Sequence, residues 1–145
     1  MSFKQVSKFL YEDISYKSTI EPQKYIFQLY KDNWDHALCE FEKSYLRAFI
    51  HKSFGNENSI ELGNNERLEF LGDSVLQLAI SENLMLENTS SKEGELSKMR
   101  SILVNEASLA ALARSLDLGR WILLGKGELK ESGHQKDSIL SNTFE

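Results

Sequence analysis

The chain is poor in the residues that would signal several common protein classes. It has one cysteine, Cys39, one proline, Pro22, and no apolar run long enough to cross a membrane. A single cysteine excludes an internal disulfide framework and a cysteine-rich zinc site, and it favours a reducing, intracellular setting, which we expect to be the cytoplasm. The opening MSFKQVSKFLYEDIS mixes acids with aromatics and does not resemble a signal or transit peptide. We therefore expect no membrane partner.

Positive charge is also scarce. The sequence carries 17 lysines and arginines against 22 acids, a formal net charge of −5. A protein that holds nucleic acid mainly through its own phosphate contacts is more often basic, so composition alone argues against a nucleic-acid partner. An acidic centre that meets phosphates through metal ions is not excluded.

What is present predicts one all-α domain. The length of 145 residues suits a single domain, and 41% hydrophobic residues can fill its core. Long alternating stretches are absent, whereas apolar spacing of helical type recurs along the chain. We expect helices over residues 1–18, 20–34, 35–51, 65–86, 96–104, 105–118 and from 137 onward, with a loop over 55–65.

Two helix ends carry more specific signals. Asn105 is expected to cap the helix of NEASLAALARSLDLG, with Leu109, Leu112 and Leu116 on one face and Gly119 as its stop. The last helix, beginning at Asp137 or Ser138, is expected to be cut short. Two explanations stay open: the sequence is a fragment, or the natural chain is truncated.

The stretch NNERLEFLGDSVL, residues 64–76, places acids inside an apolar helix. Glu66, Glu69 and Asp73 stand at i, i+3 and i+7, within a sector of roughly 60° on one helix face. Because the other faces are apolar, we expect this helix to be buried. Gly72, in mid-helix, indicates close packing or close approach.

Two interpretations of these acids compete. They could form a solvated stripe or pair with a base such as Arg67. Alternatively, they could be half of a metal site, because clustered carboxylates destabilise a fold unless a cation lies among them, and Mg²⁺ prefers carboxylate oxygens. The last helix offers Asn142 and Glu145 at i and i+3. Two antiparallel helices could present these two groups of residues to each other as an oxygen-rich cage.

The same motif resembles the signature of the ribonuclease III family, N-E-R-L-E-F-L-G-D-[SA]-V-L. FEKSYLRAFIHKSFGNEN is similar to the family's first helix and its T-H-[RK]-S-[YF] segment, and EGELSKMRSILVNEASLAALARSLDLGRWILLGKGE resembles its central helices and G-x-G-E loop. SGHQKDSILSNTFE resembles the segment that brings the second acidic pair. The resemblance covers about residues 35–145.

This resemblance implies an all-α endonuclease domain, a hydrolase that cuts double-stranded RNA to 5′-phosphate and 3′-hydroxyl ends in rRNA or mRNA processing. It implies Mg²⁺, for which Mn²⁺ can substitute, and no small-molecule cofactor. The implied metal ligands are Glu69, Asp73, Asn142 and Glu145, with Asp73 and Glu145 catalytic and Glu66 in support. It further implies a homodimer in which Phe70 packs into the partner subunit and a valley accepts the duplex.

Three departures from the family pattern bear on these expectations. Asn142 stands where the family usually has aspartate, which removes one negative charge. The sequence stops at Glu145, so we expect a shortened final helix and no double-stranded-RNA-binding domain. We expect residues 1–34 to form an N-terminal helical extension, for which we recognise no match. The rival hypothesis is therefore a catalytically weakened module that binds RNA or a protein without cutting.

Other polar residues point less clearly to chemistry. His51 ends an apolar helix and is expected to be packed or to act as a cap, while His134 lies in a loop where a weak phosphate contact is conceivable. Lys126 and Glu128, in the GKGE loop, are expected to be structural.

Overall fold

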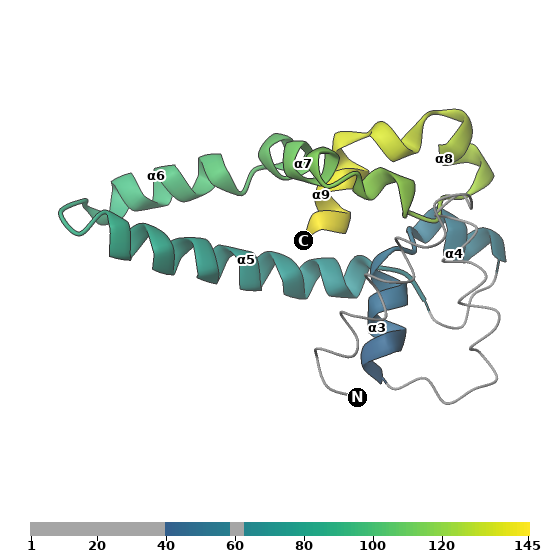
Figure 1. Ribbon diagram of the computed structural model, residues 1–145, viewed down its shortest axis with the longest axis horizontal. Coiled ribbons are helices and arrows are strands. Elements are labelled where there is room, and N and C mark those ends of the chain that lie inside the picture. The colour runs from purple at the N-terminus through teal and green to yellow at the C-terminus, as the bar shows by residue number, and fades with distance from the viewer. Residues whose placement is uncertain (1–39, 59–62) are drawn as a thin grey trace.

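The computed structural model describes residues 40–58 and 63–145 of the chain. In these ranges the secondary structure is helical, apart from one isolated parallel bridge between Ile50 and Leu123. The all-α prediction is thereby confirmed for these ranges. The elements, shown in Figure 1, are α3 (Glu40–Ala48), α4 (Lys52–Asn58), α5 (Glu66–Glu87), α6 (Glu93–Leu103), α7 (Glu106–Ser115), η1 (Leu118–Arg120), α8 (Lys126–Lys130), η2 (Gly133–Gln135) and α9 (Asp137–Phe144).

Helix α5 is the longest element of the described chain, at 22 residues, and α6 returns beside it (Figure 1). The start of α5 is fixed by Asn65, whose backbone N–H donates to the carbonyl of Ile50 over 2.9 Å. Further along, Arg100 of α6 donates through Nη1 to Ser81 Oγ of α5 at 2.9 Å. The predicted helix over 65–86 is confirmed within one residue at each end.

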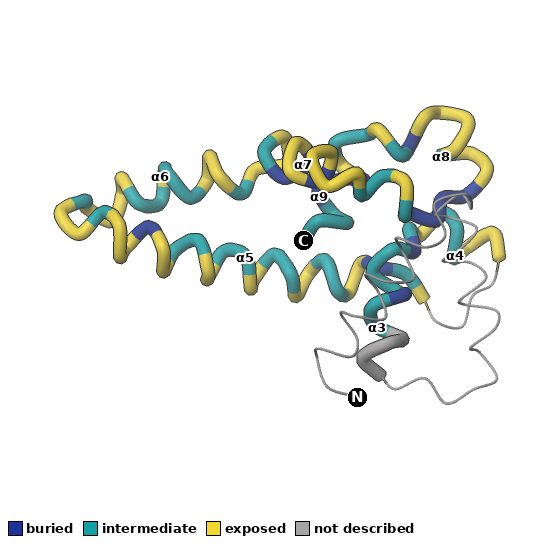
Figure 2. Tube along the Cα trace, viewed as in Figure 1, coloured by how far each residue is buried: buried dark blue, intermediate teal, exposed yellow. Residues whose placement is uncertain are grey.

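The core lies away from this hairpin, where α7 packs against α9. Its buried members share small or aliphatic side chains and come from α7, the segment after η1, and α9: Ala110, Ala113, Ile122, Leu124, Ile139 and Leu140. Figure 2 shows the buried segments gathered there and around the bridge, while most of α5 and α6 is intermediate or exposed. This packing positions α9 relative to the rest of the domain.

Asn105 caps α7 as predicted, because its Oδ1 accepts the backbone N–H of Ser108 at 2.8 Å. The predicted stop at Gly119 is wrong. Helix α7 ends at Ser115, and the left-handed residue that follows is Asp117, with φ 54°. Gly119 is needed for another reason: a Cβ there would stand 2.5 Å from the carbonyl oxygen of His134.

Two other expectations also fail. The loop predicted over 55–65 begins later, since α4 extends to Asn58. Of the three leucines predicted on one face of the 105–118 helix, Leu109 is buried, whereas Leu112 and Leu116 are exposed. The prediction of a buried 65–86 helix is wrong for the chain by itself, because Leu84 is the buried residue of α5 and Phe70 is 79% exposed. Apolar spacing predicts which face of a helix favours burial. In the described part of this chain, few residues cover that face of α5.

Several predictions fall outside the described residues. They concern the helices over 1–18 and 20–34, the extension 1–34 as a whole, and Cys39. Within the described ranges, no helix has the length and hydropathy of a membrane span.

Candidate functional site

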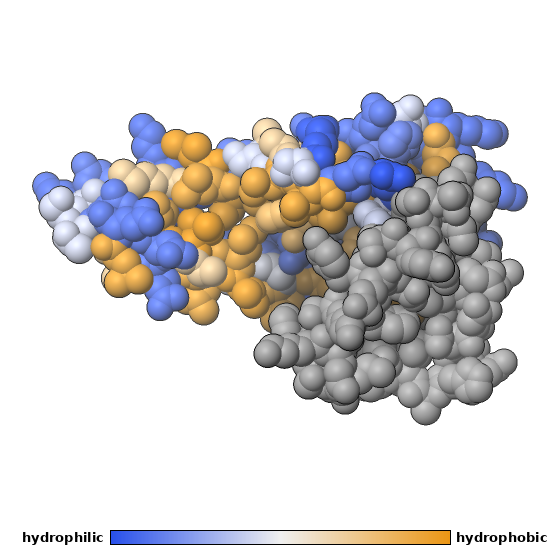
Figure 3. All heavy atoms as spheres, viewed as in Figure 1, coloured by the Kyte–Doolittle hydropathy of each residue, from blue (hydrophilic) through white to orange (hydrophobic). Residues whose placement is uncertain are grey.

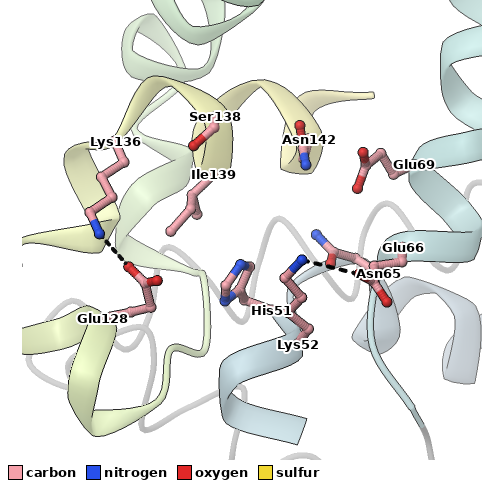
Figure 4. Close-up of a pocket in the computed structure, with 10 residues that line it drawn as sticks. All are labelled: His51, Lys52, Asn65, Glu66, Glu69, Glu128, Lys136, Ser138, Ile139 and Asn142. Carbon is pink, nitrogen blue, oxygen red and sulfur yellow. Dashed lines mark hydrogen bonds and ion pairs between the residues drawn. The ribbon is translucent and has the colours of Figure 1, made fainter. Parts of the chain in front are cut away.

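The C-terminal end of α9 meets the side of α5 at Gly72. A Cβ at position 72 would overlap the backbone carbonyl of Glu145, so only glycine permits this approach. The close approach predicted for Gly72 is thus confirmed, and it brings the two acidic segments of the sequence together. The helices do not run antiparallel along each other as expected. Figure 4 shows α9 crossing toward α5, with Asn142 facing Glu69.

The pKa values of two glutamates reflect this proximity. The pKa of Glu69 is raised, first by burial and then by the charge of Glu66, while a hydrogen bond from Asn142 works in the opposite direction. The pKa of Glu145 is also raised, first by burial and then by the charges of Asp73 and Glu69. Carboxylates from α5 and from the end of α9 therefore repel one another across the contact.

The third acid of the row, Asp73, is held by its own helix. Gln77 Nε2 lies 3.0 Å from Asp73 Oδ1 and 3.0 Å from Oδ2 and donates to both. Sequence reasoning overlooked Gln77, although its position four residues after an acid on the same helix face is a usable signal.

The donor set matches a hard divalent cation in chemistry, with three carboxylates and one amide. In the part of the chain that the structure describes, however, no three acid, histidine or cysteine side chains converge closely enough to hold a metal ion. Repulsion between the carboxylates of Glu69 and Glu145 acts against convergence. The residues expected as ligands are therefore electrostatic neighbours, and within the described residues they do not form a closed cluster of metal-binding side chains.

Glu66 occupies the edge of the cluster and is paired. Its carboxylate lies 3.4 Å from Lys52 Nζ and accepts a hydrogen bond from Asn64 Nδ2 at 3.2 Å. The base that pairs with the acid row is thus Lys52 of α4. One of the two interpretations allowed such a pairing and gave Arg67 only as an example. Lys52 also opposes the rise in the pKa of Glu69. Spacing in the sequence could not reveal Lys52, because a loop separates it from α5.

A pocket of about 450 Å³ opens beside the acids (Figure 4). Its lining is polar on both sides and comprises His51, Lys52, Asn65, Glu66, Glu69, Glu128, Lys136, Ser138, Ile139 and Asn142. Glu128 accepts from Lys136 Nζ at 2.7 Å, which joins α8 to the start of α9 and agrees with the structural role expected of this glutamate. Asp73 and Glu145 do not line the pocket.

His51 directly precedes α4, and its carbonyl accepts the N–H groups of Phe54 and Gly55 at 3.0 and 3.2 Å. The Ser53 backbone N–H donates to His51 Nδ1 at 3.3 Å. Burial lowers the pKa of His51, which favours its neutral form. These contacts agree with the packed or capping role predicted for it.

An apolar surface lies on the same helix as the acids. Phe70, Leu71, Val75 and Leu78 are each more than half exposed, and Leu78 reaches 71%. We call these four residues the α5 apolar face. Figure 3 shows hydrophobic atoms gathered over the elongated part of the molecule formed by α5, α6 and α7. A contiguous exposed apolar surface marks a site of association.

Comparison with known proteins agrees with this geometry. A family model described as "Ribonuclease-III-like" matches residues 42–145. The "Ribonuclease 3" of Corynebacterium glutamicum is 50% identical over 112 residues, which are 77% of this chain and 45% of that protein. The "Ribonuclease 3" of Streptococcus mutans is 52% identical over 99 residues, covering 68% of this chain and 43% of that protein. The chain thus spans less than half the length of these relatives.

Solved structures give the same result. The nuclease domain of ribonuclease III from Campylobacter jejuni superposes with a TM-score of 0.65 at 40% identity, covering 82% of this chain and 78% of that one. That structure is described as showing flexibility in a region involved in dimer formation. A second structure of the same domain gives a TM-score of 0.63 at 38% identity, with 87% and 77% covered. The resemblance found in the sequence is confirmed: the chain belongs to the ribonuclease III family.

Proposed function

We propose that this chain forms the nuclease domain of an endoribonuclease that hydrolyses double-stranded RNA with the help of a divalent metal ion, of which Mg²⁺ is the expected one and Mn²⁺ a substitute. The observation that carries the proposal is the meeting of α5 and α9 at Gly72, which makes Glu69 and Glu145 electrostatic neighbours. A structural domain would gain stability by replacing either acid, so their apposition favours a centre that uses them.

Each residue has a proposed role. Glu69, Asp73 and Glu145 would supply carboxylate oxygens to the metal, and Asn142 an amide oxygen. Glu66, paired with Lys52, would support Glu69 from the edge of the cluster rather than bind directly. Bound there, Mg²⁺ would offset the acids' charge and act as a Lewis acid toward the phosphodiester.

The reaction proposed for this centre is hydrolysis of the phosphodiester bond. Water adds to phosphorus, the bond from phosphorus to the 3′-oxygen breaks, and that oxygen takes a proton, which leaves a 5′-phosphate and a 3′-hydroxyl. The net charge of −5 is compatible with RNA because the metal, rather than the protein, supplies positive charge at the phosphate. A-form shape and 2′-hydroxyl groups would be read instead of base sequence.

We further propose a homodimer, with Phe70 and the rest of the α5 apolar face against the partner subunit. An exposed apolar helix face of this kind is stabilised when a second copy of the chain covers it. A domain boundary near residue 35 and a cytoplasmic location remain predictions from the sequence.

The proposal is tested by incubating labelled duplex RNA and Mg²⁺ with the unchanged chain, Asn142→Asp and Glu69→Ala. We expect cleavage by the first two, and a loss on the order of 10²–10³-fold for Glu69→Ala, the size of effect that one electrostatic group has in other enzymes. Asn142→Asp restores a charge and should lower the Mg²⁺ concentration needed. Glu82→Ala, an exposed acid further along α5, is the matched control and should cleave normally.

Two outcomes would contradict it. If folded samples of all these chains leave the duplex intact, the proposed activity is wrong. If Glu69→Ala cleaves as fast as the unchanged chain, the proposed centre is wrong. Cleavage only after Asn142→Asp would instead support the rival hypothesis of a weakened binding module.

A further inference from the structure

His51 lines the pocket of about 450 Å³ that shares Glu69 and Asn142 with the candidate centre. We propose that His51 is a specificity-determining residue, whose Nε2–H donates a hydrogen bond to a ribose 2′-hydroxyl next to the scissile phosphate. The inference rests on the function proposed above and names a contact by which that site would distinguish RNA from DNA.

The first step is the position of the ring proton. The backbone N–H of Ser53 donates to His51 Nδ1 at 3.3 Å, and a backbone N–H can only donate, so Nδ1 is an acceptor. Ser53 Oγ lies 2.8 Å from the same nitrogen and accepts the backbone N–H of Gly125 at 2.9 Å, which leaves the hydroxyl hydrogen for Nδ1. Burial lowers the pKa of His51 and so favours the neutral ring. A neutral ring with an accepting Nδ1 carries its proton on Nε2.

The second step is the place of Nε2. The backbone holds the residue in position, since the His51 N–H donates to the Leu123 carbonyl at 3.1 Å. The ring lies between Glu128 and Lys52 at the pocket (Figure 4). Within residues 40–58 and 63–145, the ring's hydrogen bonds are both at Nδ1, and Arg47 Nε is the one fully buried side-chain nitrogen or oxygen without a partner. Nε2 is therefore accessible, and its N–H is available to a ligand in the pocket.

The third step is charge, which selects the kind of group that Nε2 meets. Lys52 Nζ lies 3.4 Å from Glu66, and Lys136 Nζ donates to Glu128 at 2.7 Å, so each lysine of the lining is paired with an acid of the lining. The remaining charged residue of the lining is Glu69, which is negative. The pocket therefore disfavours a phosphate group and suits a neutral group that both accepts and donates hydrogen bonds.

A ribose 2′-hydroxyl is such a group, and the proposed substrate carries one on every nucleotide. Because Glu69 and Asn142 belong both to the pocket and to the candidate centre, a phosphodiester at the centre brings a neighbouring ribose to the pocket. A 2′-deoxy nucleotide at that place would leave the Nε2–H of His51 without its acceptor. A site that uses a hydrogen bond to a substrate hydroxyl discriminates against the analogue that lacks the hydroxyl.

The test combines changes in the substrate with changes at position 51. Cleavage with Mg²⁺ is measured as kcat/KM on labelled RNA duplexes that each lack one 2′-hydroxyl near the scissile phosphate. For the unchanged chain we expect one position at which kcat/KM falls by about three- to tenfold, the size of one hydrogen bond. His51→Asn keeps a short side chain with an acceptor for the Ser53 N–H and loses the donor to the pocket. It should cleave the all-ribose duplex about three- to tenfold more slowly and show no further loss at that position.

Two further variants serve as controls. His51→Gln is the conservative change, because its amide nitrogen can take the place of Nε2, and it should keep the loss at that position. His134→Asn changes the histidine of a separate pocket beside Arg114 and Arg120 and should keep the loss as well. Comparing chains on the same duplex cancels any effect of the missing hydroxyl on the chemistry itself, and a merely structural role of His51 would slow all duplexes equally. Circular dichroism checks that each variant is folded.

Equal losses at every 2′-deoxy position in the unchanged chain and in folded His51→Asn would overturn the inference and leave the proposed function standing. A scan of the unchanged chain in which no single 2′-deoxy position lowers kcat/KM would also overturn it, even if His51→Asn does not fold. An unchanged chain that leaves all duplexes intact would overturn the proposed activity and this inference with it.

Discussion

At the scale of single residues, the candidate centre consists of acids with amide partners. Asn142 faces Glu69 and acts to lower the pKa of that carboxyl, and Asp73 accepts two hydrogen bonds from Gln77. An amide offsets only part of a carboxylate's charge, so the pKa of Glu69 and that of Glu145 stay raised. The folded, metal-free chain therefore carries an electrostatic cost at neutral pH.

The pH dependence of this cost has a definite sign. A carboxyl whose pKa is higher in the folded state than in the unfolded state stabilises the fold while it is protonated, and this contribution is lost as pH rises through the folded-state pKa. For Glu69 the loss begins around its ordinary pKa of 4.5 and continues above it. We expect Glu69→Gln to raise the midpoint of thermal unfolding in chelator by about 1–2 °C at pH 7, a small shift because solvent screens the site.

The measurement is thermal unfolding followed by circular dichroism at pH 7 and at a pH below 4.5. At the lower pH the gain should disappear, since the glutamate is then protonated as well. Glu82→Gln, an exposed acid nine positions beyond Asp73 on the same helix, should show no gain at either pH. A gain of equal size at both values would mean that charge is not its cause.

At the scale of elements, the approach of α9 to α5 depends on one missing side chain. A Cβ at Gly72 would overlap the Glu145 backbone, and backbone atoms cannot swing aside as a flexible side chain can. Glycine in a helix interior is otherwise unfavourable by roughly 1 kcal/mol against alanine. At this position the close contact between the two acidic segments therefore requires a residue that is unfavourable for the helix.

We expect Gly72→Ala to lower the free energy of unfolding by about 1–2 kcal/mol net, the range seen when a packed site is overfilled. It should also weaken Mn²⁺ binding, because α9 must move away from α5. Gly94→Ala in α6 is the matched control: nothing lies within 4 Å of a Cβ there, so the fold should be equally stable or more stable by up to about 1 kcal/mol. Urea unfolding measures both, and a stabilised Gly72→Ala chain would show that the approach at this position is not close.

At the scale of the whole molecule, α5 has two functions that face different ways. One side carries the acids toward α9, and another carries the α5 apolar face, of which Phe70 is the most exposed member at 79%. The core between α7 and α9 lies elsewhere and does not cover this face. The proposed dimer would bury it.

We expect Phe70→Asp to convert a dimer into a monomer, raising the dimer dissociation constant at least about 30-fold, because a buried aromatic at an interface centre contributes about 2 kcal/mol or more. Light scattering coupled to size-exclusion chromatography measures the mass. Leu129→Asp changes an exposed leucine of α8, outside the α5 apolar face, and should leave the mass unchanged. A Phe70→Asp chain that stays dimeric would place the interface on another surface.

Local chemistry was enough to predict several features of this protein. Apolar spacing predicts the long helix to within a residue at each end, and Asn105 caps α7 because its side chain serves a neighbouring backbone N–H. The motif in residues 64–76 is long and resembles a known signature, and this resemblance identified the family. All of these depend on residues close together in the chain, where spacing and covalent geometry set the contacts.

Only the tertiary structure decided what surrounds those residues. Helical spacing cannot tell whether the apolar side of α5 is covered, and the expectation of a buried helix failed because the described core forms between α7 and α9. The partner of Glu66 is Lys52, across a loop, and the meeting of Gly72 with Glu145 joins positions 73 residues apart in the sequence (145 − 72 = 73). Such contacts depend on how separate helices pack, and packing is a property of the whole chain that no local pattern contains.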